Sequence, residues 1–548
     1  MKRTVYIVLA SLSLIPALCP AEEQIQLPDV TTTVSGDSLT AGKNAIPDFS
    51  SLLPDTANAP LPKLPGAKSE SLPQEPEAAI SYESDKAIYA EGLIGGGYPG
   101  FFSGDFSIYK SSGDSPFSLR FSHESENGYG VHTAADGFSD SKTALSGAKK
   151  ITFKQSVLTL GASYDTQSYG MQSVSPCFFN TTQQTIGTKD SVLWNLPKGF
   201  SIILGTDGSW YSRYAGIVPA APAVYALQEK EASLLSVNPE LVFAWSAEQD
   251  DGHGFKMTLR SSYSLETFLT ETEATSGTTT HRGEFGIAAS WSNNTITAGA
   301  KVSIVVGNAI GSAPVIAPFA ISFATHFKQG ESERQVVISG EGGLDSYLPQ
   351  YEDLEKKYAW ATSDVLASET SDWYGLVKAS VPIASLFSFD ASGTFRKTAF
   401  ENGVWEPAYT TATGSGMYRF TATDRTLVDT DFGFSFLYKR FTLSADWKSS
   451  WLYVPVTESA YSIGVTGGMQ SETGFWGTSV GVRESLGNGA DAVPEISASG
   501  FYRLTDSLKL ALELNDAAKL FSGKDRAYAG TNYLRRAGNV KILVKFFF

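Results

Sequence analysis

The sequence of 548 residues is poor in charge and in cysteine, and beyond its N-terminus it has no long apolar run. Charged residues make up 18% of the chain, below the roughly 25% usual in soluble domains. A membrane helix needs about 18 consecutive apolar residues, so none is expected beyond the N-terminus. With 57 acidic against 42 basic residues the formal net charge is −15, which excludes a nucleic-acid binder because phosphate would be repelled.

The abundant residues point to strands. Hydrophobic residues reach 42%, too many for a chain that is disordered along its length, and aromatic residues reach 12% beside 51 glycines. Many strand-forming residues and few charges, without an apolar stretch of helical length, indicate that strands rather than helices meet lipid.

The first 21 residues have the pattern of a secretory signal peptide. Lys2 and Arg3 precede an apolar run over 5–17, and small residues follow, so cleavage is expected between Ala21 and Glu22. The alternative is a lipoprotein anchored at Cys19, which the bulky Leu18 disfavours.

After cleavage Cys177 is the single cysteine left, so no internal disulfide is expected. Residues 22–85 then form a Pro-rich periplasmic or lumen-occluding segment rather than a domain. Each proline removes a backbone donor that a helix or central strand would need; they are Pro28, Pro47, Pro54, Pro60, Pro62, Pro65, Pro73 and Pro76. The β-prone run Val30–Val34 either pairs with a partner strand or is part of a solvated tether.

Beyond residue 85 apolar and polar residues alternate with a period of two. Phe255, Met257 and Leu259 alternate with Lys256, Thr258 and Arg260, so each strand has one apolar and one polar face. A soluble β-sandwich has the same alternation. Two features favour a membrane barrel with an apolar outside: aromatic residues lie near the strand ends, and short turns such as 195–199 alternate with long polar loops such as 125–141, 344–372 and 516–537.

The C-terminus is the third feature. One face of the last ten residues is wholly apolar, and it consists of Val540, Ile542, Val544, Phe546 and Phe548. This resembles the closing strand of bacterial outer-membrane proteins, which implies recognition by the barrel-assembly machinery. Leu543 and Phe547 depart from the pattern by placing apolar groups on the lumen side.

Counting alternating segments predicts an all-β fold, a transmembrane antiparallel up-and-down barrel over 86–548 with about 22 strands (range 18–24). Residues 415–438 are taken as one long hairpin arm in this count. The architecture resembles the barrel of TonB-dependent receptors, and Asp29–Val34 is weakly similar to their energy-coupling box, which implies a TonB-type partner. Residues 22–85 are too few for that family's plug domain, so a different element must narrow the lumen. The candidates are residues 22–80 and the loop 344–372, where 351–358 is expected to form one or two helical turns; we expect this loop to fold inward.

No catalytic or metal-binding pattern stands out, so neither an enzyme nor a cofactor is predicted. Gly477–Gly481 matches G-x-S-x-G, but strand flanks it on both sides, and the glycine run 95–100 reads as a turn. The five histidines lack ligand spacing. Four acidic residues (Glu124, Glu126, Asp136 and Asp140) could be bridged by a divalent cation, although a solvated acidic face is the simpler interpretation.

The remaining candidate site is the lumen. Charged residues on the polar faces of the strands are expected to line it: Arg120, Lys256, Arg260, Asp390, Arg396, Asp446, Lys448, Lys541 and Lys545. They either set ion selectivity, which both signs of charge would keep weak, or pair across strands to fill the interior.

These patterns predict a channel or transporter for small solutes in the outer membrane of a diderm bacterium, with its loops at the cell surface. One alternative is a carrier for hydrophobic molecules similar to the fatty-acid transporters, for which Leu543 and Phe547 are the hint. The other is a surface adhesin that binds a host partner through loops such as 167–182 and 399–414.

Overall fold

The computed structural model describes residues 88–110, 115–219, 225–248, 253–270, 279–309, 315–328, 335–383, 386–453, 459–487, 493–523, 525–527, 531–536 and 538–548. The expected signal peptide with its cleavage site at Ala21 and Glu22, the Pro-rich segment up to residue 85 and the run Val30–Val34 lie outside these residues.

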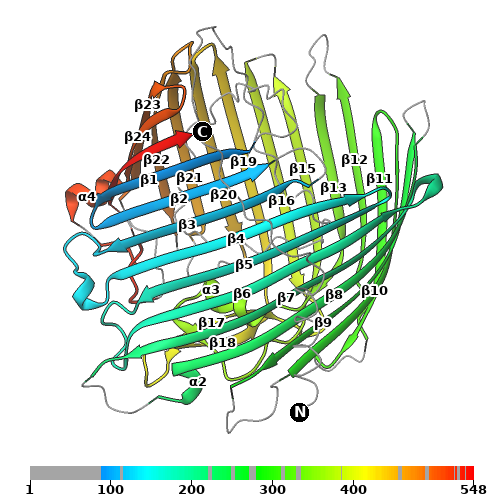
Figure 1. Cartoon of the computed structure of the whole chain (residues 1–548), viewed down its shortest axis with the longest axis horizontal. Coiled ribbons are helices and arrows are strands. Elements are labelled where there is room, and N and C mark those ends of the chain that lie inside the picture. The colour runs from blue at the N-terminus through cyan, green and yellow to red at the C-terminus, as the bar shows by residue number, and fades with distance from the viewer. Residues whose placement is uncertain are drawn as a thin grey trace, which may run out of the picture.

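A single antiparallel sheet of 22 strands closes on itself as a barrel (Figure 1). Its strands are β1 (Tyr89–Tyr98), β2 (Phe101–Lys110), β3 (Phe117–Asn127), β4 (Ser139–Phe153), β5 (Ser156–Gly170), β6 (Phe178–Asn195), β7 (Phe200–Ile217), β8 (Glu231–Glu248), β9 (Gly254–Phe268), β10 (Thr279–Ser292), β11 (Ile296–Gly307), β12 (Phe319–Lys328), β13 (Gln335–Tyr347), β15 (Thr370–Ile383), β16 (Phe387–Thr398), β19 (Thr426–Tyr438), β20 (Phe441–Trp451), β21 (Tyr461–Gln470), β22 (Trp476–Leu486), β23 (Glu495–Thr505), β24 (Leu508–Asn515) and β25 (Asn539–Phe547). The predicted fold class and strand number are confirmed.

The first and last strands close the barrel. β1 pairs with β2 on one side and with β25 on the other, from Glu91 opposite Phe547 to Tyr98 opposite Val540. On β25, Ile542 is 53% exposed whereas Leu543 is buried, so the two faces of the closing strand differ as the alternation predicts. Because β1 covers the free edge of β25, the barrel has no open sheet edge.

The two ends of the barrel differ. Turns such as 195–199, between β6 and β7, are short and lie at the end where β1 begins and β25 finishes, whereas the longer connections lie at the opposite end. In this turn Gly199 has φ +77°, and a Cβ there would lie 2.0 Å from the Ser246 carbonyl oxygen, so only glycine fits. We call these two ends the short-turn end and the loop end.

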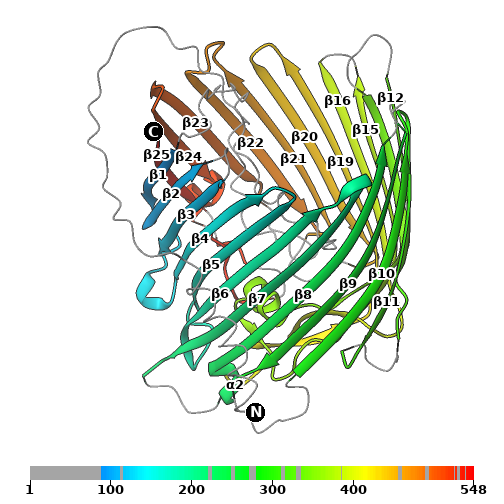
Figure 2. The ribbon, with the colours of Figure 1, turned by 45° about the vertical axis from the view of Figure 1, so that its right-hand side comes forward.

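Two long connections contain a second, smaller sheet. Strands β14 (Ala361–Thr362), β17 (Val404–Ala412) and β18 (Tyr418–Thr423) form it, and helix α3 (Tyr351–Lys357) precedes β14. Figures 1 and 2 show α3, β17 and β18 within the outline of the barrel, toward the loop end. The helical turns expected over 351–358 are therefore present.

The prediction of one hairpin arm over 415–438 is wrong. β18 pairs with β14 and β17, and only β19 after it pairs with the barrel strands β16 and β20. Tyr418 and Phe420 continue the alternation of β19, but instead of facing lipid both are buried in a hydrophobic cluster with residues of other connections. The barrel still has 22 strands because the inner strands stand outside its sheet.

Two further short helices lie in loop-end connections: α2 (Leu227–Lys230) follows β7 and α4 (Ala517–Ser522) follows β24. No helix in the described part of the chain combines the length and the hydropathy needed to cross a membrane.

Candidate functional site: the lumen and its plug

The buried side chains of β6 show which face of the barrel wall points into the lumen. On β6, Thr181, Gln183 and Thr185 are buried while Ile186 beside them is 50% exposed. The buried set contacts the 348–369 connection: Thr181 Oγ1 donates to the Ala359 carbonyl and Gln183 Nε2 to the Glu355 carbonyl. Because α3 lies within the barrel (Figure 2), these side chains face the lumen and their exposed neighbours face outward.

An ion pair with no solvent exposure anchors α3 to the wall. Arg213 of β7 donates from Nε to the Glu355 carboxylate at 2.9 Å, and both side chains are fully buried. Tyr211 and Tyr351 also donate to this carboxylate, at 2.6 and 2.7 Å, and the Thr362 hydroxyl donates at 2.7 Å. The buried charges are therefore paired and hydrogen-bonded, as buried charges must be.

The rest of α3 is held by polar contacts to neighbouring strands. The Glu352 carboxylate accepts hydrogen bonds from Thr185 on β6 and Ser209 on β7, at 2.8 and 3.0 Å. Lys356 bridges Glu352 at 2.8 Å and Asp165 of β5 at 3.2 Å. The loop 344–372 thus folds against the inside of the wall.

A second group of ion pairs fixes the bases of the two long connections. Arg282 of β10 holds the buried Glu369 at 3.0 Å. The buried Asp372 at the start of β15 receives Arg396 from β16 at 3.4 Å and Arg425 at 3.1 Å.

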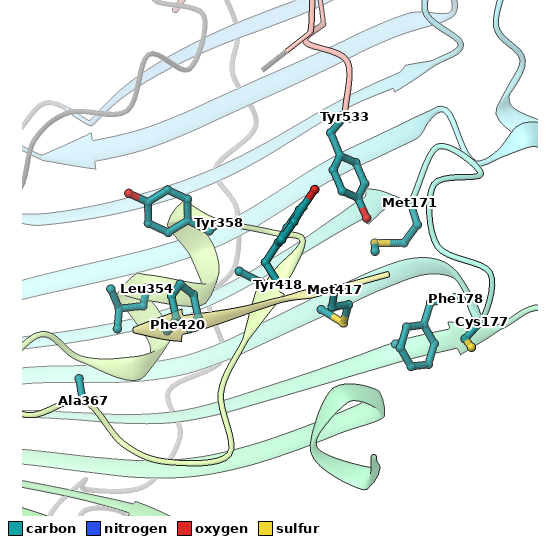
Figure 3. Packing of buried hydrophobic residues seen from close by; sticks show 12 residues of the cluster. Met171, Cys177, Phe178, Leu354, Tyr358, Ala367, Met417, Tyr418, Phe420 and Tyr533 are labelled. Atoms are coloured by element: carbon teal, nitrogen blue, oxygen red, sulfur yellow. The ribbon is translucent and has the colours of Figure 1, made fainter. Parts of the chain in front are cut away.

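A buried hydrophobic cluster joins loops from different parts of the barrel (Figure 3). Its members are Met171, Cys177, Phe178, Ala215, Leu354, Tyr358, Ala361, Ala367, Met417, Tyr418, Phe420 and Tyr533. They come from the connections β5–β6, β13–β15, β16–β19 and β24–β25 and from the wall. The ring of Trp360 stacks on that of Tyr533, with centroids 5.0 Å apart. Since the four connections leave the barrel at widely separated strands, the cluster bridges the loop end of the lumen. We call residues 348–369 and 399–425, which supply its central part, the inner plug.

Two side chains of the inner plug have raised pKa values. Asp353 of α3 is exposed, but the neighbouring wall removes part of its hydration, and this loss of water together with the charge of Glu352 raises its pKa to about 6. Burial, and then the charge of Glu355, raise the pKa of the Tyr351 phenol, so Tyr351 stays protonated and can donate.

The acidic residues near 124–140 hold an arginine. Arg536 of the β24–β25 connection lies 2.7 Å from Asp140, 3.5 Å from Glu124 and 3.7 Å from Glu126. The fourth residue, Asp136, instead accepts from Thr133. Neither a solvated face nor a cation bridge describes this cluster, because a guanidinium from a distant loop supplies the positive charge.

Five of the nine residues expected to line the lumen form ion pairs. Asp105 binds Arg120, Glu240 binds Arg260 at 2.6 Å, Asp345 binds Arg396 at 3.3 Å, Arg483 binds Asp446 at 3.1 Å, and Asp431 binds Lys448 at 3.5 Å. Of the others, Lys541 Nζ lies 4.0 Å from the Phe101 ring centroid, Lys545 lies opposite Lys509, Lys256 opposite Ser290, and Asp390 opposite Gly433. The structure does not gather the nine into one site, and their role in selectivity stays a prediction.

On the closing strand, Val540, Ile542, Val544 and Phe546 share one face, and Phe548 follows them. Leu543 packs on the opposite, inner face with Phe101, Phe501 and Ala511. The G-x-S-x-G match at Gly477–Gly481 lies within β22, and the glycine run 95–100 spans the end of β1 and its turn. In the described part of the chain, no three His, Cys, Asp or Glu side chains are grouped to hold a metal ion.

The residues that anchor the plug were not predicted from the sequence. Arg213 and Glu355 are separated by 142 positions, so their pairing depends on the tertiary structure. One local signal existed: Glu355 shares a helix face with Tyr351 and Leu354, and a charged residue on an apolar face needs a buried partner.

Comparison with known proteins shows the same fold in solved structures. The iron transporter FrpB from Neisseria meningitidis (F5-1 variant, apoprotein form) matches with a TM-score of 0.61 and 9% identity over 85% of this chain and 82% of that one. A mutant of the ferric enterobactin receptor PfeA from Pseudomonas aeruginosa, in complex with enterobactin, matches with a TM-score of 0.61 and 9% identity over 86% and 82%. The copper transporter OprC matches with a TM-score of 0.58 and 11% identity over 84% and 80%.

The predicted resemblance to the barrel of TonB-dependent receptors is confirmed. At about 10% identity the likeness concerns the fold. No protein-family model matches the sequence, and no curated protein matches it.

Proposed function

We propose that the protein is an outer-membrane transporter for a small solute, whose route is the barrel lumen and whose gate is the inner plug. The membrane location is supported by the closed barrel and by its outer face, where large apolar side chains such as Ile321 (65% exposed) and Val377 (59% exposed) would otherwise meet water. The longer connections then lie at the cell surface and the short turns in the periplasm, as in bacterial barrels of this kind.

The observation that carries the proposal is the bridging of the loop end by four connections. An open porin would need a water-filled lumen through its whole length, whereas here packed side chains cross it at one end. Passage of a solute therefore requires the inner plug to move. The buried Arg213–Glu355 pair holds the plug against the wall, so moving the plug requires this pair to break.

Proteins of similar fold are described as transporters of iron and copper and as a receptor for ferric enterobactin. These descriptions favour transport over adhesion and favour a small ligand.

We further propose that a TonB-type protein contacts Val30–Val34. This partner would supply the energy that moves the inner plug. Binding of a purified TonB C-terminal domain to the full protein, lost on deletion of 29–34, would support this partner.

Single-channel recording tests the gate. Replacing residues 348–369 by a short Gly-Ser turn should raise conductance several-fold and let larger sugars enter in liposome-swelling assays. Shortening the loop 269–278 on the same end of the barrel serves as the control and should leave both unchanged. Equal conductance in the wild type and the 348–369 variant would show that these residues do not close the route.

A further inference from the structure

Two opposite charges lie on the outer face of the barrel wall. Lys149 of β4, Leu160 of β5 and Asp190 of β6 occupy directly opposite positions on three neighbouring strands (Figure 1). All three point outward, because Leu145 and Ile186, four residues away on β4 and β6, share their face and are 44% and 50% exposed. We call Lys149, Leu160 and Asp190 the charged row.

The charged row lies inside the aromatic residues that mark the short-turn end. Phe153 of β4 is 56% exposed, and Trp194 of β6 lies in the same row of the sheet. Lys149 and Asp190 are each four residues from these rings, about 13 Å along a strand and about 9 Å in depth at a tilt near 45°. Since aromatic residues mark the membrane interface, both charges lie at the level of hydrocarbon, where a charge on the outer face is destabilising.

The surrounding strands do not neutralise these charges. Asp190 Oδ1 accepts a hydrogen bond from the Gly161 backbone nitrogen at 3.3 Å, and neither Asp190 nor Lys149 forms an ion pair with another described residue. The four-carbon stem of a lysine can extend toward the interface, but an aspartate side chain is too short to do so. Charged groups at this depth pair with one another, so Asp190 needs a positive group in front of the wall.

We propose that a second copy of the chain supplies this group, in a dimer whose copies contact through the outer faces of β4, β5 and β6. A two-fold axis perpendicular to the membrane and beside Leu160 brings Lys149 of each copy to Asp190 of the other. This is the self-complementary contact of an isologous interface, and it needs one positive and one negative residue on either side of the axis.

The spacing of the charged row permits this contact. Lys149 and Asp190 are two strand spacings apart, about 9.6 Å. At a strand tilt near 45° they differ in depth by about 7 Å, which the lysine stem can span. Gly147 and Ala162 lie opposite each other in the next row of the same face, and such small residues let two backbones approach closely.

Charge reversal tests whether the pair joins two chains. Full-length proteins with two different affinity tags are co-expressed and captured through one tag. Wild-type chains should co-purify, whereas Lys149→Glu with itself, or Asp190→Lys with itself, should co-purify at least tenfold less, because like charges then meet across the interface. Lys149→Glu co-expressed with Asp190→Lys should restore co-purification, since both contacts between the two chains again join opposite charges.

A charge on a distant part of the outer face provides the matched control. Glu484 of β22 lies opposite the outward-facing Ile463, and Glu484→Lys should leave co-purification unchanged. Heat-modifiable migration on a gel shows that each variant forms a folded barrel. Single variants that co-purify like the wild type would show that the charged row is not the contact. A mixed pair that stays separate would show that the two charges act within one chain. Either result overturns the proposal.

Cross-linking in intact outer membranes tests the dimer without detergent. The two-fold axis places Leu160 beside its counterpart, so Leu160→Cys should form a covalent dimer on mild oxidation. Val480→Cys, at a 53% exposed outward position of β22, should not, and the wild type, whose Cys177 is buried, gives the background. If Leu160→Cys stays monomeric, lipid or a different protein covers the charged row and the proposal is wrong. These outcomes do not bear on the transport proposal, which depends on the inner plug.

Discussion

At the scale of single residues, arginines pair with the carboxylates that are buried between the inner plug and the barrel wall. Moving two charges out of water costs several kcal/mol per ion, and their attraction compensates only when the remaining lone pairs are satisfied. Glu355 meets that condition, since Arg213, Tyr211, Tyr351 and Thr362 all donate to it. Removing one partner of such a pair leaves the other buried and uncompensated.

The first prediction concerns this pair. Glu355→Gln should destabilise the docked inner plug by about 3–5 kcal/mol, the usual cost of breaking a buried ion pair. The released state should become at least about a hundredfold more populated, since each 1.4 kcal/mol is a factor of ten. Single-channel recording should show frequent large openings that are rare in the wild type.

The matched control for this variant is Glu352→Gln on the same helix. Glu352 is partly exposed, and its partners are hydroxyls and Lys356. The substitution should therefore destabilise the docked inner plug by about 1 kcal/mol or less. Equal channel behaviour of the two variants would show that the buried pair is not what keeps the plug docked.

At the scale of elements, α3 has no stability of its own. A helix of seven residues is far below the length at which an isolated helix persists in water, so it forms only where the wall holds it. Its docking must therefore respond to any charge that changes at the interface.

The second prediction concerns pH. The pKa of Asp353 rises from an ordinary 3.8 to about 6 when α3 is docked. Between pH 4 and 6 the docked form keeps a proton that the released form gives up, so docking weakens as pH rises through this window. Burial also raises the pKa of Glu369 in the same connection, which acts in the same direction. Channel openings should be fewer at pH 5 than at pH 7.5.

The variant Asp353→Asn separates the titration of Asp353 from the titration of other groups. The amide stays neutral, so at pH 7.5 the variant should open more rarely than the wild type, and its pH profile should be flatter, with Glu369 supplying the pH response that remains. The barrel without 348–369 reports how pH acts on the wall alone. A full pH response in Asp353→Asn would assign the titration to other groups.

The elements show what sequence can and cannot reveal. Period-two alternation predicts the barrel because each strand obeys it independently of the others, and the β25 pattern predicts closure. The same rule fails at β18, since Tyr418 and Phe420 alternate just as a lipid-facing strand does but meet the buried cluster instead. The Arg213–Glu355 anchor depends on a contact across 142 positions, and no local pattern encodes such a distance.

At the scale of the whole molecule, many charges of the inner wall are paired with a charge of opposite sign. Pairs such as Arg260–Glu240 and Asp446–Arg483 join opposite signs on neighbouring or nearby strands. Paired charges on a wall fill space and orient water, but they produce little net field along the lumen.

The last prediction follows from this balance. Once the inner plug is replaced, reversal potentials in a tenfold KCl gradient should stay close to zero, because neither sign of charge dominates the paired wall. Arg483→Gln should leave Asp446 without its partner and shift the reversal potential toward cation preference, whereas Ser485→Gln, at the neighbouring inward position of β22, should not. A strong preference for either ion in the unsubstituted wall would show that unpaired charges, and not the paired ones, control conduction.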